Sequence, residues 1–190
     1  MFDDLIAHIQ SEIHLTETEV EKFKSFWKVF ELSKDDYLLR NGDLCMFDSY
    51  VVKGCLKAYC INTKTGKEDI LFFATEKWWA TDLDSFVNKT PSIYNLKAIE
   101  NTTMLRISRE SFIELLDTLP KLEKYFRIIL ERYIASMQRR VIILNSYTAE
   151  EKYQHFIEQY PSMLQRVPQY LIASYLGVTP EFLSRVRGKK

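Results

Sequence analysis

The stretch Pro168–Arg187, PQYLIASYLGVTPEFLSRVR, decides the fold of the C-terminal part of the chain. Apolar residues at helical spacing predict a first helix that ends at Leu176, and Gly177 can adopt the positive φ of a helix C-cap. Thr179 followed by Pro180 is typical of an N-cap and a first helical residue. We therefore expect two short helices that meet across a tight turn.

Small and aliphatic residues in this stretch have the spacing of a helix-turn-helix. Ala173 lies four residues before Gly177, where the two helices must approach closely and only a small side chain fits. Val178, Leu183 and Val186 are expected to close the junction. An ordinary helical hairpin with a solvated, charged end is the alternative interpretation.

The second helix of this stretch is expected to turn a polar face outward. Its side chains suit DNA because arginine can bond guanine twice, glutamate can accept from cytosine, and serine can contact base edges or phosphates. The start of the first helix would offer backbone N–H groups to a phosphate. The predicted DNA-binding residues are Gln169, Thr179, Pro180, Glu181, Ser184, Arg185 and Lys189.

Charge is unevenly distributed along the chain. The 190 residues include 26 Lys and Arg and 26 Asp and Glu, so the overall net charge of zero gives no hint of a nucleic-acid partner. From Gln165 to Lys190, however, five basic residues stand against one acidic residue, which gives +4 for this segment and leaves −4 for residues 1–164. A basic C-terminus agrees with the DNA-binding interpretation.

Composition excludes several classes of protein. Hydrophobic residues at 46% and aromatic residues at 14% are typical of a folded globular chain, which excludes disorder and fibrous repeats. No apolar run reaches the roughly 18 residues that span a bilayer, so we expect a cytoplasmic protein with no membrane partner. Cys45, Cys55 and Cys60 form no even disulfide framework, and structural burial is expected for them.

Strands are predicted in the middle of the chain. From Asp36 to about Arg106, short β-branched and aromatic runs separated by glycine turns predict a small antiparallel barrel or jelly roll. Tyr50–Gly54 and Leu56–Ile61 are expected to form one hairpin around Gly54. A second hairpin is expected to turn through Gly66.

Helices are predicted on both sides of these strands. Residues 2–30 show helical periodicity that extends to Phe30, with Thr16 as an N-cap. After Pro120, apolar intervals of three and four predict a helix of about 25 residues. This helix can pair with a copy of itself or pack on its own barrel. We favour pairing because both flanks of its apolar stripe are apolar or aromatic.

The order of these segments resembles the Crp-Fnr superfamily of bacterial transcription regulators. The resemblance covers nearly the whole chain, and it implies an α+β fold with a β-barrel or jelly roll of the cyclic-nucleotide-binding type, flanking helices, a long dimerisation helix and a C-terminal helix-turn-helix. The sequence motifs that carry it are Gly42-Asp43, Tyr50–Gly54, Trp78–Asp82, Pro120–Leu122 and Arg166–Arg185.

The resemblance implies a sensor domain at residues 1–119, a dimerisation helix at 120–146 and a DNA-binding domain at 147–190. A capping box at Thr148–Glu151 begins the first helix of the last domain. The resemblance also implies a homodimer with its recognition helices in successive major grooves of double-stranded DNA. Because the sequence ends five residues after Arg185, we expect no full β-hairpin wing, and DNA contact would rest on the helix and its basic tail.

Superfamily members that bind cyclic AMP carry a Gly-Glu pair for the ribose and an Arg-Ser pair for the phosphate. Counting back from Ile107-Ser108, Thr81-Asp82 stands at the first pair and Ser92-Ile93 at the second, so the phosphate-binding arginine is missing. We therefore expect an unknown small-molecule effector other than cyclic AMP. Adjacent tryptophans either line its pocket or fill the core, and we favour core filling. The candidate effector pocket comprises Trp79, Asp82, Ser92, Met137 and Gln138.

Two alternatives to a DNA-binding regulator stay open. The chain could be a small-molecule sensor or adaptor whose helix-turn-helix contacts protein. An enzyme is the least favoured class, because the sequence shows no nucleophile–base set, zinc-spaced cluster or phosphate-cradling glycine loop. His8, His14 and His155 lie in separate segments, so no metal and no cofactor are predicted.

Overall fold

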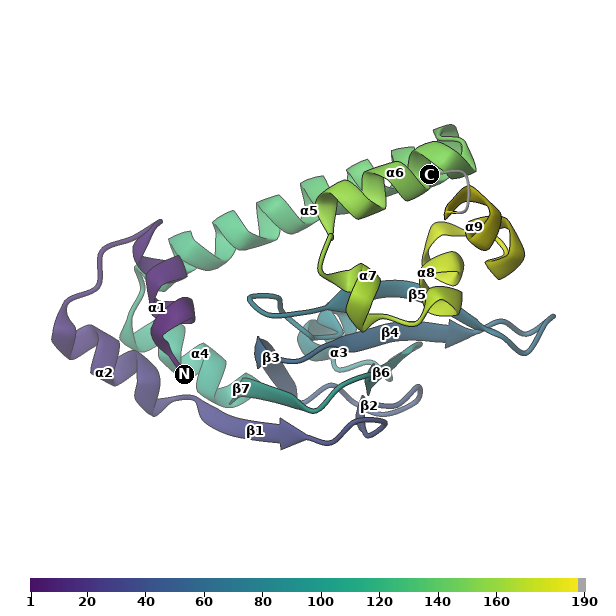
Figure 1. Cartoon of the computed structure of the whole chain (residues 1–190). Helices are drawn as coiled ribbons and strands as arrows, with labels where there is room; N and C mark the ends of the chain where they lie inside the picture. The colour runs from purple at the N-terminus through teal and green to yellow at the C-terminus, as the bar shows by residue number, and fades with distance from the viewer. Residues whose placement is uncertain (188–190) are drawn as a thin grey trace. The chain divides into compact units, whose positions relative to one another are not determined.

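The computed structural model of the chain (Figure 1) describes residues 1–187, the side chain of Arg187 excepted. Its strands are β1 (Lys28–Leu32), β2 (Tyr37–Leu39), β3 (Phe47–Lys53), β4 (Leu56–Ile61), β5 (Glu68–Ala74), β6 (Asn95–Ala98) and β7 (Thr102–Ser108). Its helices are α1 (Asp3–Gln10), α2 (Glu17–Ser25), α3 (Leu83–Asn88), α4 (Arg109–Thr118), α5 (Leu122–Ser146), α6 (Ala149–Gln159), α7 (Met163–Arg166), α8 (Gln169–Leu176) and α9 (Pro180–Arg187).

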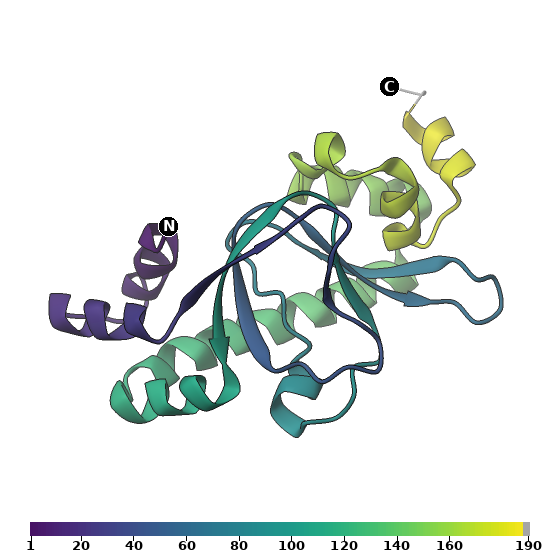
Figure 2. The ribbon, with the colours of Figure 1, turned by 90° about the horizontal axis from the view of Figure 1, so that it is seen from below.

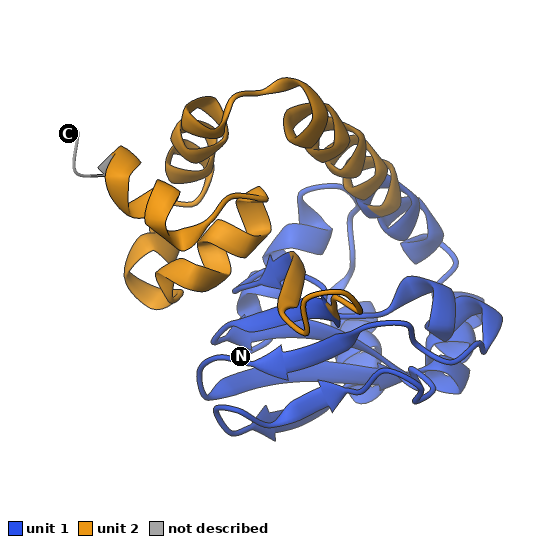
Figure 3. Cartoon of the chain, turned by 90° about the vertical axis from the view of Figure 1, so that its right-hand side faces the viewer, with its two compact units in different colours: residues 1–60, 72–129 blue, residues 61–71, 130–190 orange. Residues whose placement is uncertain are grey.

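The chain divides into two compact units, coloured separately in Figure 3. Unit 1 comprises residues 1–60 and 72–129, and unit 2 comprises residues 61–71 and 130–190. Unit 2 therefore includes the tip of the β4–β5 hairpin as well as the second half of α5. Both the hairpin and the long helix run from one unit into the other.

The strands form two sheets that wrap around a common interior (Figure 2). One sheet has the order β1-β7-β3 and the other the order β2-β6-β4-β5. Strand β7 pairs antiparallel with β1 and β3, and β6 pairs antiparallel with β2 and β4. This arrangement confirms the α+β class and the jelly-roll type of sensor expected from the sequence.

Two local predictions are wrong. Phe30 lies in β1 and pairs with Met104 of β7, because strand pairing across the sheet outweighs the helical spacing of its neighbours. Gly54 does not turn a hairpin, since β3 and β4 belong to different sheets. Its φ of 108° lets the chain cross between the sheets, and an added Cβ would lie 2.5 Å from Oγ1 of Thr102.

The predicted helix starts are confirmed. The side chains of Thr16 and Thr148 each accept from the backbone N–H three residues later, at 3.3 Å in both cases. The carboxylates of Glu19 and Glu151 accept in return from the backbone N–H of the threonine, at 2.8 Å. Each capping box satisfies two amides that would otherwise lack a partner at the helix start. The long helix α5 has 25 residues, which agrees with the predicted length.

The core of unit 1 joins the N-terminal helices to the first sheet and to the start of α5. Leu5, Phe23, Leu105 and Tyr125 are fully buried members of this cluster. Cys45 and Cys55 are buried and form no disulfide among the described residues, as expected, and Cys60 is partly buried. Among the described residues, no group of three or more potential ligands forms a metal site, and no helix has the length and apolar character to cross a bilayer.

Candidate nucleic-acid interface and effector site

Helices α8 and α9 meet at a tight corner in unit 2. Gly177 caps α8 with a φ of 69°, in the left-handed region, and the N–H of Val178 donates to the carbonyl of Ala173 at 3.0 Å. The Thr179 hydroxyl accepts from the N–H of Phe182 at 3.2 Å and so caps α9. These contacts confirm the helix-turn-helix corner, because each predicted cap residue makes the bond expected of it.

Apolar side chains fix the angle of this corner. Ala173 is fully buried, so the contact between the helices leaves space for a methyl group only. Leu183 of α9 is buried with 2% exposure against the apolar side of α8, while Val178 and Val186 are partly buried. The buried face of α9 therefore decides which of its side chains face outward.

The outward face of α9 carries the side chains predicted to contact DNA. Hydrogen bonds from its own backbone N–H and from the Thr179 side chain lower the pKa of Glu181, which keeps it a hydrogen-bond acceptor. Lys189 lies outside the described residues, and DNA contact by the others stays a prediction. The exposed members of the predicted set are Gln169, Thr179, Pro180, Glu181, Ser184 and Arg185.

A side-chain hydroxyl anchors the tip of the β4–β5 hairpin to the helix-turn-helix within unit 2. The Ser174 hydroxyl of α8 accepts from the N–H of Ile70 at 3.0 Å and donates to the carbonyl of Glu68 at 2.7 Å. Both hairpin atoms are main-chain atoms, so the anchor satisfies one donor and one acceptor at the edge of the hairpin. The sequence analysis assigned no role to Ser174, because its partners Glu68 and Ile70 lie far away in the chain and no local pattern predicts the contact.

Two of the predicted effector-site residues lie in direct contact in unit 1. The Asp82 carboxylate accepts from the N–H of Ser85 at 3.2 Å, which caps α3, and from the Ser92 hydroxyl at 2.6 Å. Asp82 and Ser92 are 4% and 2% exposed. The chain's own carboxylate therefore occupies the amino end of α3, where an anionic group of a ligand would otherwise be favoured.

A second carboxylate lies beside this pair. The Asp48 carboxylate accepts from the Thr81 hydroxyl and, at 2.9 Å, from the N–H of Ser49. Burial raises the pKa of Asp48 to about 6, against 3.8 for a free side chain. At the position that the sequence analysis matched to the phosphate-binding arginine, Ser92 thus supplies a hydroxyl that donates to Asp82, and no cation. The sequence analysis did not single out Asp48, since an acid in a strand has no distinctive spacing.

Trp79 belongs to an aromatic cluster in the core of unit 1. Its ring centroid lies 5.8 Å from that of Trp27, 5.3 Å from that of Tyr50 and 5.7 Å from that of Phe126. These contacts favour the packing interpretation of Trp79. Met137 and Gln138 belong to unit 2, and a single pocket that unites the five predicted residues stays a prediction.

Replacing Asp48 with asparagine should make the protein less sensitive to pH. The folded state holds the Asp48 proton more tightly than the unfolded chain does, so this group lowers the free energy of unfolding as pH rises from about 4 to about 6. The amide oxygen of asparagine can still accept both hydrogen bonds. In urea unfolding, the variant should gain about 3 kcal/mol over the wild type at pH 7.5 and only about 0.5 kcal/mol at pH 4. An equal difference at both pH values would contradict this assignment.

Residues 29–118 match the family model of the cyclic nucleotide-binding domain. Among curated proteins, the chain is 27% identical over 166 residues to the transcriptional activator protein Anr of Pseudomonas aeruginosa, an alignment that covers 82% of this chain and 67% of Anr. It is also 27% identical over 168 residues to the transcriptional activator protein FnrA of Stutzerimonas stutzeri, with the same two shares covered.

Solved structures with the same fold include FixK2 from Bradyrhizobium japonicum, with a TM-score of 0.73, 16% identity, and coverage of 86% of this chain and 83% of FixK2. The c-di-GMP-responsive global regulator CLP of Xanthomonas campestris has a TM-score of 0.73 at 15% identity, with 92% and 91% covered. The fold and the site define a protein in which a cyclic-nucleotide-binding-type domain precedes a helix-turn-helix. Within that class, the family model, the transcriptional activators and the solved structures agree with the resemblance to the Crp-Fnr superfamily found in the sequence.

Proposed function

We propose that the protein is a homodimeric, sequence-specific DNA-binding transcription regulator whose sensor domain responds to a small molecule. The observation that carries this proposal is the exposed face of α9, where Glu181, Ser184 and Arg185 are exposed while Leu183 is buried at the corner with α8. A helix presented in this way can enter a major groove with its polar side chains toward the base edges. The relatives named transcriptional activators support the same function.

The second half of α5 supports the homodimer. Leu130, Ile134, Met137, Val141 and Leu144 follow one another at intervals of four and three, the heptad spacing of a coiled-coil seam. Leu130, Ile134 and Val141 are 43%, 50% and 56% exposed in the single chain. A second copy of α5 would bury this seam and would place two recognition helices on one duplex.

The structure supports an effector other than cyclic AMP. At the position matched to the phosphate-binding arginine, Ser92 supplies a hydroxyl that already donates to Asp82 at 2.6 Å, and no cation. A phosphodiester there would lose a bidentate, charge-assisted pair. Calorimetric titration with cyclic AMP should therefore show no binding below millimolar concentration, and micromolar affinity would refute this part of the proposal.

DNA binding can be tested by fluorescence anisotropy with a labelled duplex from the promoter of the protein's own gene. The full chain should bind this duplex more tightly than a scrambled duplex of equal length, and affinity should fall steeply with salt because phosphate contacts release counterions. A dimer that binds neither duplex would favour the adaptor hypothesis, in which the helix-turn-helix contacts protein.

Replacing Arg185 with alanine should relax the sequence preference of the protein. The exposed guanidinium of Arg185 lies 5.4 Å from the Phe182 ring and can reach base edges from the outward face of α9. Loss of a bidentate contact to guanine costs about 1–3 kcal/mol on the preferred duplex and much less on scrambled DNA. Lys189→Ala serves as the comparison and should weaken both duplexes about equally. The same loss on both duplexes for Arg185→Ala would remove Arg185 from base recognition.

A further inference from the structure

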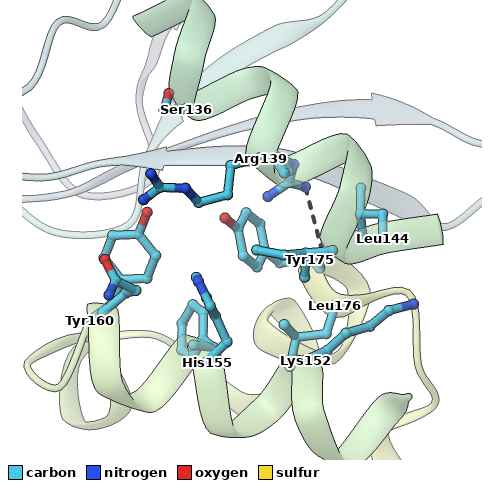
Figure 4. Close-up of a pocket in the computed structure, with 12 residues that line it drawn as sticks. Ser136, Arg139, Leu144, Lys152, His155, Tyr160, Tyr175 and Leu176 are labelled. Atoms are coloured by element: carbon cyan, nitrogen blue, oxygen red, sulfur yellow. Dashed lines mark hydrogen bonds between the residues drawn. The ribbon is translucent and has the colours of Figure 1, made fainter. Parts of the chain in front are cut away.

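Unit 2 contains a hollow of about 130 Å³ between the second half of α5, helix α6 and the end of α8 (Figure 4). All residues that line it belong to unit 2. Figure 4 shows the Arg139 and His155 side chains pointing into the space between α5 and α6, beside the rings of Tyr160 and Tyr175. None of these residues belongs to the predicted effector pocket.

The lining of this hollow is basic. Of its twelve residues, Arg139, Arg140, Lys152 and His155 are basic, and none is Asp or Glu. Within residues 1–187, the side chains of Arg139, Lys152 and His155 make no hydrogen bond or ion pair. A concave surface with unneutralised cations concentrates positive potential and attracts small anions.

The acids of α6 do not cancel this charge locally. The Glu151 carboxylate accepts from the backbone N–H of Thr148 at 2.8 Å, and the Glu158 carboxylate accepts from the Gln154 amide. Neither these two carboxylates nor Glu150, the third acid of α6, lines the hollow. The Arg139 guanidinium of α5 and the His155 imidazole of α6 therefore face a hollow whose lining contains no acid.

The remaining wall of the hollow is rigid. The Arg140 guanidinium lies 3.8 Å from the centre of the Tyr175 ring and donates to the carbonyls of Ile70 and Tyr175 at 3.4 and 3.5 Å. Burial, reinforced by Tyr175 and by a side-chain hydrogen bond with it, raises the pKa of Tyr160 to about 12, so its phenol stays protonated. A fixed guanidinium reduces the ordering cost of binding an anion.

The proposed dimer would leave this hollow open. In the heptad defined by Ile134 and Val141, Arg139 stands at the position farthest from the seam. Arg140 stands at the next position, which flanks the seam. A second copy of α5 would therefore cover the side of the helix opposite Arg139, and of the residues that line the hollow only Leu144 belongs to the seam. The Arg139 side of the hollow stays accessible to a small molecule in both the monomer and the dimer.

We propose that this hollow binds the phosphate group of a small phosphorylated molecule, with Arg139 and His155 as its principal contacts. Phosphate is favoured because guanidinium groups bind its oxygens in pairs, and the imidazole can supply a further donor. The volume resembles that of an engineered cavity of about 150 Å³ that holds benzene, so one phosphate or one small ring with a phosphate fits. A larger nucleotide would extend into solvent.

Such a ligand would connect α5 to α6 and α8. A ligand that bridges Arg139 and His155 would stabilise one arrangement of α5 relative to α6, the first helix of the predicted DNA-binding domain. The effect on DNA affinity rests on the proposed function, whereas ligand binding itself does not. The two can be measured separately.

The site can be tested on the full chain by calorimetric titration with inorganic phosphate, phenyl phosphate and, as an uncharged ring, benzyl alcohol. Either phosphate should bind, and Arg139→Gln or His155→Gln should weaken binding at least tenfold. Because the Arg139 side chain makes no hydrogen bond among the described residues, the Arg139→Gln variant should fold normally. Arg132→Gln, on the same helix but outside the hollow, should change the affinity less than twofold. Tighter binding of phenyl phosphate would assign a phosphate ester, and tighter binding of inorganic phosphate would assign the free ion.

Several outcomes would overturn the proposal. These are the absence of phosphate binding, unchanged affinity in both hollow variants, or equal binding of benzyl alcohol. Duplex DNA is a further control. If scrambled duplex displaces the phosphate probe, and Arg139→Gln weakens duplex binding as much as probe binding, then the cations contact the DNA backbone instead. Because the titrations contain no DNA, a failure of the proposed regulator function would leave their result intact.

Discussion

Replacing Ile134 with glutamate should convert the protein from a dimer into a monomer and lower its affinity for its own promoter duplex at least a hundredfold. Ile134 lies in the middle of the exposed heptad seam of α5 and is 50% exposed in the single chain. A second copy of the helix would bury it, so the variant would place two carboxylates in one apolar interface without a cationic partner. A monomer presents one recognition helix and loses the gain from joining two half-sites.

Light scattering gives the oligomeric state of this variant, and fluorescence anisotropy gives its DNA affinity. Ala135→Glu is the matched control, because it adds the same side chain one residue later, at an exposed position outside the seam. The control should remain a dimer and bind DNA as the wild type does. A dimeric Ile134→Glu protein would show that α5 is not the dimer interface.

Truncating Leu183 to alanine should destabilise unit 2 by about 2–5 kcal/mol. Leu183 is 2% exposed and is the one fully covered side chain of α9 within residues 180–186. Its loss leaves a cavity at the corner with α8 and frees α9 from the contact that sets its orientation. The variant should therefore lose DNA binding while α5 still forms the dimer.

Urea unfolding monitored by circular dichroism measures this loss, with light scattering to confirm the dimer. Leu183→Met is the conservative control, since it keeps the volume and should cost less than about 1.5 kcal/mol. Normal DNA binding by Leu183→Ala would show that the corner does not depend on this side chain for its geometry.

Local features were predictable because they depend on a few neighbouring residues. The N-cap at Thr16, the capping box at Thr148 and the corner at Gly177 and Thr179 each involve contacts within about four residues. The length of α5 followed from its apolar periodicity in the same way. These elements carry most of the candidate DNA interface, so that interface could be predicted in outline.

Features set by distant pairing were not predictable from local pattern. Phe30 pairs with Met104 in β1 and β7, and the chain changes sheets at Gly54. The nearby sequence predicts neither feature. The spacing around Phe30 is typical of a helix, and the pattern around Gly54 is typical of a hairpin. Long-range strand pairing had to override both local preferences.

The two candidate ligand sites differ in the same respect. Counting from a superfamily landmark placed Asp82 and Ser92 at matching positions, and they are joined by a hydrogen bond of 2.6 Å. The hollow around Arg139 and His155 was missed because it depends on how α5, α6 and α8 pack. In the sequence, Arg139 is one of several charges on the polar side of a long helix, and the histidine has no ligand spacing.

The anchor at Ser174 has a consequence for the evolution of this fold. Its hydroxyl contacts the N–H of Ile70 and the carbonyl of Glu68, atoms that every residue except proline possesses. Side chains at the hairpin apex, residues 62–67, can therefore vary without loss of the attachment. A different sequence of equal length at residues 62–67 would still be held by Ser174. This loop is therefore a place where new surface chemistry could be acquired beside α8 and α9.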